Sequence, residues 1–161
     1  MKLLRETIRK LILESSITYE SGYLQRDGIF HVTAYADGKQ IGTMGLHYLD
    51  PAELQSDCKE DYERVIRELD FYSRNHGTPR SSSFRKLEVF DVGVDSEYQN
   101  QGIGTTLYEK ALQLDGGNVI LVASKCVEGS TSYDAERVWR RLAKKYVSSG
   151  FILASLIDQD A

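Results

Sequence analysis

The stretch that most constrains the fold is residues 87–114, LEVFDVGVDSEYQNQGIGTTLYEKALQL. Residues 87–94 are rich in β-forming side chains and contain no proline, which predicts a buried strand. After a turn with two glycines, apolar residues recur on one helical face, at Ile103, Leu107, Ala111 and Leu114. A strand, a glycine turn and a helix in this order predict one α/β unit, against which the rest of the chain must pack.

The turn inside this unit suits a phosphate group. Helix N-termini expose unpaired N–H groups and the positive end of the helix dipole. Gly102 and Gly104 would let an anion reach these amides without meeting a Cβ. The Walker loop needs Gly-Lys-Ser/Thr and the Rossmann fingerprint needs three glycines, and neither pattern is present. The turn therefore predicts a diphosphate cradle of another kind.

The order of the strand, the motif Gln99-x-x-Gly102-x-Gly104 and the helix resembles the acetyl-CoA signature of the GNAT superfamily of N-acetyltransferases, (Gln/Arg)-x-x-Gly-x-(Gly/Ala). The resemblance implies a mixed α/β fold in which a mostly antiparallel, twisted sheet is flanked by helices. It implies acetyl-CoA as co-substrate, with the pantetheine arm along Val92, Gly93 and Val94. The pyrophosphate would then lie on the amides of Gln99, Asn100, Gln101, Gly102, Ile103, Gly104 and Thr105.

The same resemblance implies direct transfer of an acetyl group from the thioester to an amine in a ternary complex. Because an ammonium is not a nucleophile and a free lysine has a pKa near 10.4, a base must remove its proton. Glu88 is the candidate, since it lies eleven positions before Gln99, where the histone-acetylating branch of the family has its glutamate. A carboxylate in an apolar strand is costly unless it is paired or functional. Asp91 is the competitor, and strand alternation predicts that it points to the opposite face from Glu88.

Many family members use a tyrosine of the late helix to protonate the leaving thiolate, and two alignments disagree here. Counting from Ser132 places Trp139 at that position, whereas counting back from Gly150 places Tyr146 there. Tyr146 is the candidate general acid, and a purely structural role in the core is the alternative.

The rest of the chain predicts a single domain over residues 16–161. Three β-rich runs joined by Asp-Gly turns predict a meander, at residues 17–25, 29–36 and 40–49. Periodicity then predicts helices at 51–72 and 132–146 and strands at 119–122 and 151–157. The usual pair of helices between the first two strands of the family is missing, which leaves the acceptor site and the substrate open.

Residues 1–15, MKLLRETIRKLILES, form an amphipathic segment that would pack on the domain or on a partner chain. The segment lacks the long apolar centre and cleavage site of a signal peptide, so secretion is not expected. Ile12-Leu13-Glu14 also resembles the end of the capsid-targeting peptides of large tailed phages. That resemblance implies cleavage before Ser15 and a place in a phage particle.

Charge and composition limit the kinds of partner and binding site that are expected. A net charge of −4 argues against nucleic acid as the main partner and suits an amine. Cys58 and Cys126 form no Cys-x-x-Cys pair, so reduced thiols are expected. The three histidines, His31, His47 and His76, lack the spacing of metal ligands, so no metal site is expected. There is no apolar run near 18 residues and hence no predicted membrane span.

Together these features predict a cytoplasmic N-acetyltransferase, located in the host cytoplasm or the virion if the chain is of phage origin. The acceptor would be a small-molecule amine, a protein lysine or a protein N-terminus, and the oligomeric state, including a homodimer, is left open. The alternative is a non-catalytic acyl-CoA-binding or phage-particle interaction protein on a degenerate GNAT fold.

Overall fold

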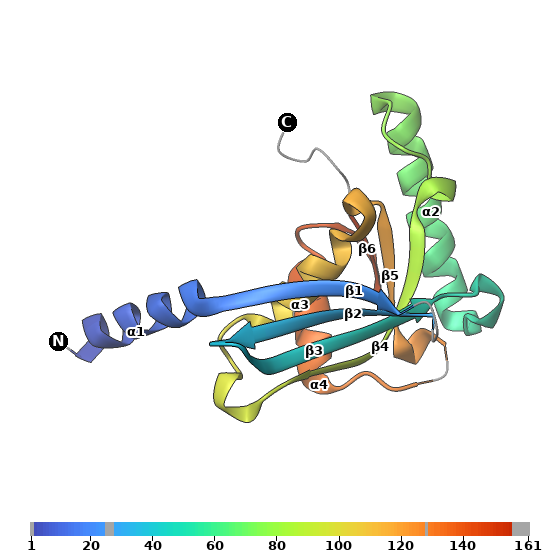
Figure 1. Cartoon of the computed structure of the whole chain (residues 1–161). Helices are drawn as coiled ribbons and strands as arrows, with labels where there is room; N and C mark the ends of the chain where they lie inside the picture. Colours follow the sequence, from blue (N-terminus) through green and yellow to red (C-terminus); the bar gives the residue numbers. More distant parts are fainter. Residues whose placement is uncertain (1, 25–27, 128, 156–161) are drawn as a thin grey trace.

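A seven-stranded mixed sheet with the strand order β1-β2-β3-β4-β5-β7-β6 forms the centre of the molecule (Figure 1). The computed structural model describes residues 2–24, 28–127 and 129–155. The described residues contain four α-helices, namely α1 (Lys2–Ser16), α2 (Ser56–His76), α3 (Ile103–Leu112) and α4 (Tyr133–Leu142). The predicted mixed α/β class with a mostly antiparallel sheet is confirmed.

The first half of the sheet consists of the predicted three-stranded meander and the predicted central strand. The strands β1 (Ile17–Leu24), β2 (Ile29–Ala36), β3 (Lys39–Tyr48) and β4 (Arg85–Val94) pair antiparallel in sequence order. Asp37 and Gly38 both have positive φ, at 52° and 79°, as the tight turn between β2 and β3 requires. Gly28 also has positive φ, at 65°, whereas Asp27 lies outside the described residues.

The second half of the sheet begins with a parallel pair. Helix α3 connects β4 to β5 (Val119–Ala123), and these two strands run parallel. β7 (Ile152–Ala154) pairs antiparallel with β5, and β6 (Val147–Ser149) pairs with β7. β6 was not predicted, because the apolar spacing in this part of the sequence predicts a helix that continues to Tyr146. The helix ends at Leu142, and the positive φ of Gly150 closes a β6–β7 hairpin instead.

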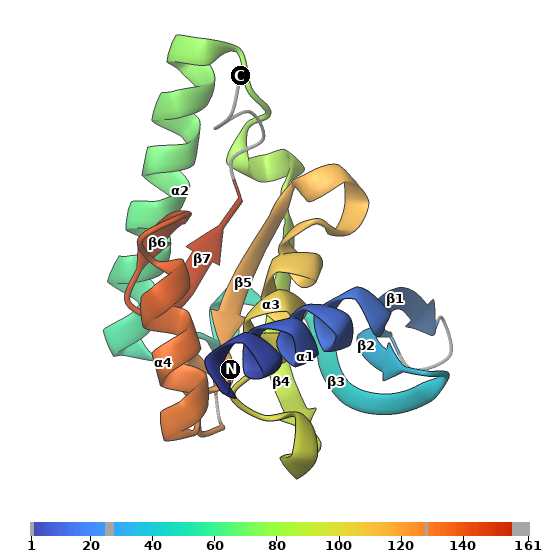
Figure 2. The same ribbon diagram turned by 90° about the vertical axis from the view of Figure 1, so that its left-hand side faces the viewer.

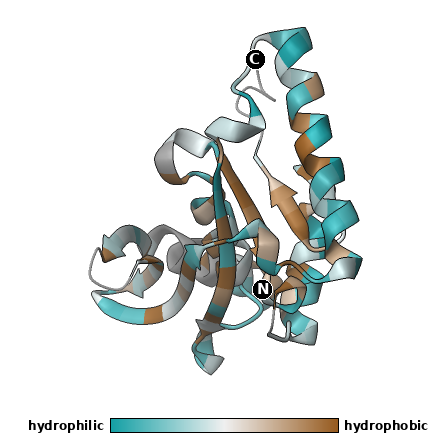
Figure 3. Cartoon of the chain, turned by 90° about the vertical axis from the view of Figure 1, so that its right-hand side faces the viewer, coloured by the Kyte–Doolittle hydropathy of each residue, from teal (hydrophilic) through white to brown (hydrophobic). Residues whose placement is uncertain are grey.

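Helices cover the two faces of the sheet unequally (Figure 2). α3 and α4 contribute Leu107 and Trp139 to the core on one side, which we call the α3 face. α2 contributes Val65 and Leu69 to a second core over β5, β6 and β7, on the side that we call the α2 face. In Figure 3 these strands beside α2 are largely brown, whereas α2 itself carries both teal and brown residues. None of the helices described is long and apolar enough to cross a membrane.

The N-terminal helix α1 projects from the start of β1 and away from the sheet (Figure 1). Leu3, Leu4 and Ile8 are exposed, at 80%, 60% and 47%. The predicted helical segment is therefore present, but these apolar side chains do not pack on the domain. Cleavage before Ser15 stays a prediction.

A β-bulge interrupts the pairing of β3 with β4. Gly45 pairs with Asp91 and Leu46 pairs with Val89, so Phe90 is an extra residue in β4. The bulge turns the Phe90 ring onto the α2 face, directly over Gly45, where a Cβ would come within 2.7 Å of the ring.

The bulge also changes which residues of β4 share a face. Val89 before the bulge and Val92 and Val94 after it all pack against the core of the α3 face, although strict alternation would separate them. By the same shift, Asp91 lies on the α2 face together with Glu88. The prediction that the two carboxylates point to opposite faces is wrong, because the extra residue reverses the alternation.

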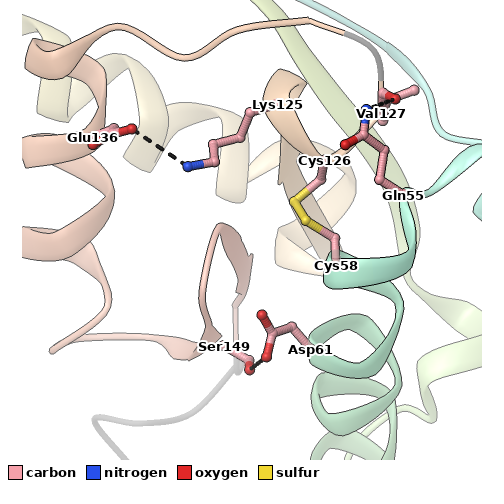
Figure 4. The surroundings of a disulfide bond; sticks show 8 residues. All are labelled: Gln55, Cys58, Asp61, Lys125, Cys126, Val127, Glu136 and Ser149. Atoms are coloured by element: carbon pink, nitrogen blue, oxygen red, sulfur yellow. Dashed lines mark hydrogen bonds and ion pairs between the residues drawn. A yellow bond between two sulfur atoms is a disulfide. The ribbon is translucent and has the colours of Figure 1, made fainter.

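A disulfide joins Cys58 near the start of α2 to Cys126 in the turn after β5 (Figure 4). Both cysteines are buried, and their Cα atoms lie 5.6 Å apart. The Gln55 side chain donates a hydrogen bond to the Val127 carbonyl beside it, at 3.1 Å. The expectation of reduced thiols is therefore wrong, since packing of α2 against β5 brings together two positions that are 68 residues apart.

Candidate functional site

A cleft of about 410 Å³ lies where the end of β4 meets the first turns of α3 and α4. All predicted cofactor-binding residues line this cleft except Gln101, whose side chain donates to the Glu97 carbonyl at 3.3 Å. The remaining lining residues were not predicted, namely Tyr98, Tyr108, Ser132, Asp134, Ala135, Arg137, Val138 and Arg141. The structure thus brings the glycine turn, the end of the central strand and the late helix to one place.

The cleft exists because β4 continues past the end of its pairing with β5. The parallel ladder ends where Val89 pairs with Ala123, whereas β4 runs on to Val94. Residues 92–94 keep their antiparallel partners on β3 and face the cleft on the other side. An extended ligand lying beside residues 92–94 could therefore form hydrogen bonds with their backbone N–H and C=O groups, as a neighbouring strand would.

The first turn of α3 has the properties of an anion site. Gly102 is its N-cap with φ 81°, so no side chain caps the helix, and no acidic residue lies in the first turn. The Thr106 amide donates to the Gly102 carbonyl, which leaves the amides of residues 103–105 as the unpaired donors of the helix start. The dipole adds positive potential at the same point.

The two glycines of this turn indicate whether the site has room for the phosphates of an acyl-CoA. Gly102 needs its positive φ for the backbone, but Gly104 lies inside the helix, where glycine costs about 1 kcal/mol relative to alanine. A Cβ added at Gly104 would meet nothing within 4 Å. Packing does not explain this glycine, whereas close approach of a phosphate to the backbone does, so the residues fit the group that the motif implies.

Two arginines on α4 complete the wall opposite this turn. Arg137 and Arg141 lie one helical turn apart and both line the cleft. Arg141 Nη1 donates to Thr105 Oγ1 at 3.3 Å, which joins α4 to the first turn of α3. This pair was not predicted from the sequence, although the i, i+4 spacing of the two arginines after the Ser132 cap indicates a common helix face.

Two tyrosines line the cleft, and neither is Tyr146. Tyr108 is buried with its ring 5.3 Å from that of Trp139, edge to face, and burial raises the pKa of Tyr108 to about 12. Tyr98 follows β4 and packs against the same core. Trp139 is therefore a core residue, and it contacts the cleft-lining Tyr108.

Tyr146 lies beyond the end of α4, against the core of the α3 face. Burial raises the pKa of its hydroxyl, and the nearby Glu109 carboxylate raises the pKa further. The Lys145 ammonium lies 5.8 Å from the ring centroid. Tyr146 does not line the cleft, so its role as a general acid stays a prediction.

Glu88 lies one position before the last pair of the β4–β5 ladder, on the α2 face. Its side chain is only 8% exposed, and one carboxylate oxygen lies 3.5 Å from His47 Nε2. His47 is the cross-strand partner of Glu88 on β3. The carboxylate is therefore paired, and its partner is a histidine that the sequence analysis left without a role. Within the described part of the chain, no cluster of His, Cys, Asp and Glu could hold a metal ion.

A family model described as Acetyltransferase (GNAT) family matches residues 3–118. No curated protein sequence matches this chain. Among solved structures, the IAA acetyltransferase from Bacillus cereus ATCC 14579 is 14% identical, with 86% of this chain and 94% of that chain covered and a TM-score of 0.47. An aminoglycoside acetyltransferase from an uncultured soil metagenomic sample, in complex with sisomicin, is 11% identical, with coverages of 85% and 92% and a TM-score of 0.49. The ribosomal-protein-alanine N-acetyltransferase from Brucella melitensis biovar Abortus 2308 is 14% identical, with coverages of 86% and 72% and a TM-score of 0.43.

Proposed function

Because the chain belongs to the GNAT acetyltransferase family, we propose that it is an N-acetyltransferase that uses acetyl-CoA to acetylate a primary amine. The observation that carries the proposal is the first turn of α3, where uncapped amides and Gly104 face an open cleft. A bound acetyl-CoA would supply an activated acetyl group as a thioester.

The cleft offers a matching partner for each part of such a molecule. The backbone of Val92, Gly93 and Val94 would hold the pantetheine arm, and the amides of residues 99–105 would hold the pyrophosphate. Arg137 and Arg141 add two guanidinium groups, which pair with phosphate oxygens in a bidentate manner.

The amine would approach from the α2 face, where Glu88 lies at the point at which β4 and β5 separate. The Glu88 carboxylate would take part in removing a proton from the ammonium group, since only the neutral amine can attack a carbonyl carbon. Among the described residues no helix lies between β1 and β2, and His31, Thr33 and Tyr35 stay partly exposed on this face. The acceptor side is thus more open than the cofactor side.

The first test is a calorimetric titration of the protein with acetyl-CoA, beside the variant Gly104→Glu. The added carboxylate would occupy the cleft and repel the phosphates, so binding should be lost. Gly22→Glu is the matched control, because a Cβ at Gly22 also meets nothing within 4 Å but lies on β1, outside the cleft. Equal binding by both variants would contradict the proposed site, as would a flat trace from well-folded wild type.

The second test separates enzyme from binding protein. Glu88→Gln should lower turnover by at least about tenfold while the acetyl-CoA affinity stays unchanged, because Glu88 does not line the cleft. Turnover is measured as thiol release over a panel of small amines, lysine peptides and peptide N-termini. Tight binding of acetyl-CoA without turnover for any acceptor would favour a non-catalytic acyl-CoA-binding protein.

The exposed apolar side chains of α1 favour one further candidate role, that of a leader directing the chain into a phage particle. Mass spectrometry of the protein from its native source tests this. A mature chain beginning at Ser15 is expected, and an intact Met1 terminus in assembled particles would rule the leader out.

A further inference from the structure

His47 and Glu88 form a cross-strand pair in which only the histidine is accessible. The Glu88 side chain is 8% exposed and the His47 side chain is 41% exposed, with 3.5 Å between His47 Nε2 and a carboxylate oxygen. A buried carboxylate is poorly placed to meet an amine that arrives from solvent. The His47 imidazole lies beside this carboxylate on the same face and is the accessible member of the pair.

Three contacts orient the imidazole ring. Nε2 faces the Glu88 carboxylate, and Nδ1 lies 3.2 Å from the Tyr48 carbonyl oxygen. The Phe90 ring stacks on the imidazole with 5.0 Å between centroids and 26° between planes. The bulge places Phe90 there, and Gly45 leaves the space for its ring.

This arrangement has a chemical consequence for the neutral histidine. The Glu88 carboxylate can accept a hydrogen bond from Nε2–H, and in that tautomer the lone pair lies on Nδ1. After Nδ1 takes up a proton, the Tyr48 carbonyl can accept the new N–H. Both hydrogens of the imidazolium then have an acceptor.

From this geometry we infer that His47 is the group that takes the proton from the acceptor ammonium, and that Glu88 is a positioning residue behind it. The inference rests on the proposed function. One ammonium proton passes to Nδ1 and on to solvent, and the amine nitrogen then bonds to the acetyl carbon as the C–S bond breaks. The second proton from nitrogen ends on the released sulfur, so the products are an amide, a thiol and one proton.

Several other ionisable groups lie on this face around His47. Glu88 is its direct partner on β4, with Lys86 and Asp91 on the same face of that strand. On β2, His31 lies diagonally, opposite Gly45. Lys86 is turned away, since its ammonium donates to the Ser81 carbonyl. Glu88 and Asp91 are therefore the anionic groups that share this face with His47.

The test is the pH profile of kcat/KM for His47→Gln, Glu88→Gln and wild type. Wild type should show an acidic limb, on which protonation of the base lowers kcat/KM. His47→Gln should lose this limb and about 10² or more in kcat/KM, as expected for a lost general base. Glu88→Gln should keep the limb, with a loss of about tenfold in kcat/KM, because His47 remains but is no longer oriented by the carboxylate.

A rescue experiment provides a second readout. His47→Ala leaves a gap beside the Phe90 ring, and added imidazole should restore part of the turnover. His76→Ala is the matched control, because His76 also lies against an aromatic ring, that of Tyr72 at 4.2 Å, on the far end of α2. Imidazole should have no effect on that variant or on wild type.

The results separate this inference from the proposed function. If wild type acetylates an amine but His47→Gln keeps both its rate and its acidic limb, His47 is not the base. A larger loss in Glu88→Gln than in His47→Gln would return the role of base to the carboxylate. If wild type shows no acetyl-CoA binding, the proposed function itself fails.

Discussion

Breaking the Cys58–Cys126 disulfide should lower the stability of this domain by a large amount. The bond closes a loop of 68 residues that contains α2, β4 and α3. In the chain-entropy account, the entropy removed from the unfolded state for such a loop corresponds to about 4 kcal/mol at 25 °C. For a chain of 161 residues this predicts a fall in Tm of roughly 8–16 °C.

The assay is thermal unfolding with and without a phosphine reductant. The chain contains only these two cysteines, so reduction has a single target. The double variant Cys58→Ala/Cys126→Ala is the control, since its Tm should not respond to the reductant. Two reactive thiols in denaturant before any reduction, or an unchanged Tm after it, would refute the bond and this reasoning with it.

Three further predictions concern the cleft and α2. Gly104→Ala should raise the free energy of unfolding by about 0.5–1 kcal/mol, because the helix has room for the added Cβ, and it should weaken acetyl-CoA binding. Thermal unfolding measures the first effect and calorimetric titration the second. An unchanged acetyl-CoA affinity would contradict the close approach of a phosphate to the Gly104 backbone. Arg137→Gln with Arg141→Gln should weaken acetyl-CoA binding about tenfold and reduce its salt dependence, as calorimetry at two ionic strengths would show. The backbone amide and then the hydroxyl of Ser81 hydrogen-bond to Asp70, and together they hold the pKa of this carboxyl below its ordinary value. Because the folded-state pKa is lowered, the ionised Asp70 stabilises the fold above about pH 4, and this contribution is lost as the pH falls. Asp70→Ala should therefore lower the free energy of unfolding by about 1 kcal/mol at pH 7 and by less at pH 3, as measured by urea unfolding.

The sequence was sufficient for the elements that local chemistry determines. Asp37-Gly38 predicted a hairpin turn, Ser132 predicted the cap of α4, and the spacing from Gln99 to Gly104 predicted the strand, turn and helix of the cleft. Each of these depends on residues close together in the chain.

What the sequence did not predict depends on contacts between distant residues. The bulge at Phe90 follows from the register with β3, and it turned Asp91 to the face of Glu88. The pairing of Cys58 with Cys126 follows from the packing of α2 on β5. Nothing in the spacing of His47 indicates that β3 would place it opposite Glu88, and this cross-strand register carries the inference about proton transfer.

The extra residue at Phe90 acts as a phase shift in the alternation of β4. It keeps Glu88 on one side of the sheet and turns Val92 and Val94 toward the other, so the length of this segment matters as much as its composition. A conservative replacement of Phe90 leaves the phase unchanged. Deleting Phe90 would remove only the extra position and leave Asp91 opposite Gly45 and Val92 opposite Met44, so both sides of the strand would keep their residues. Regular pairing of the unchanged strand, without the bulge, would instead exchange the two sides from residue 91 onward.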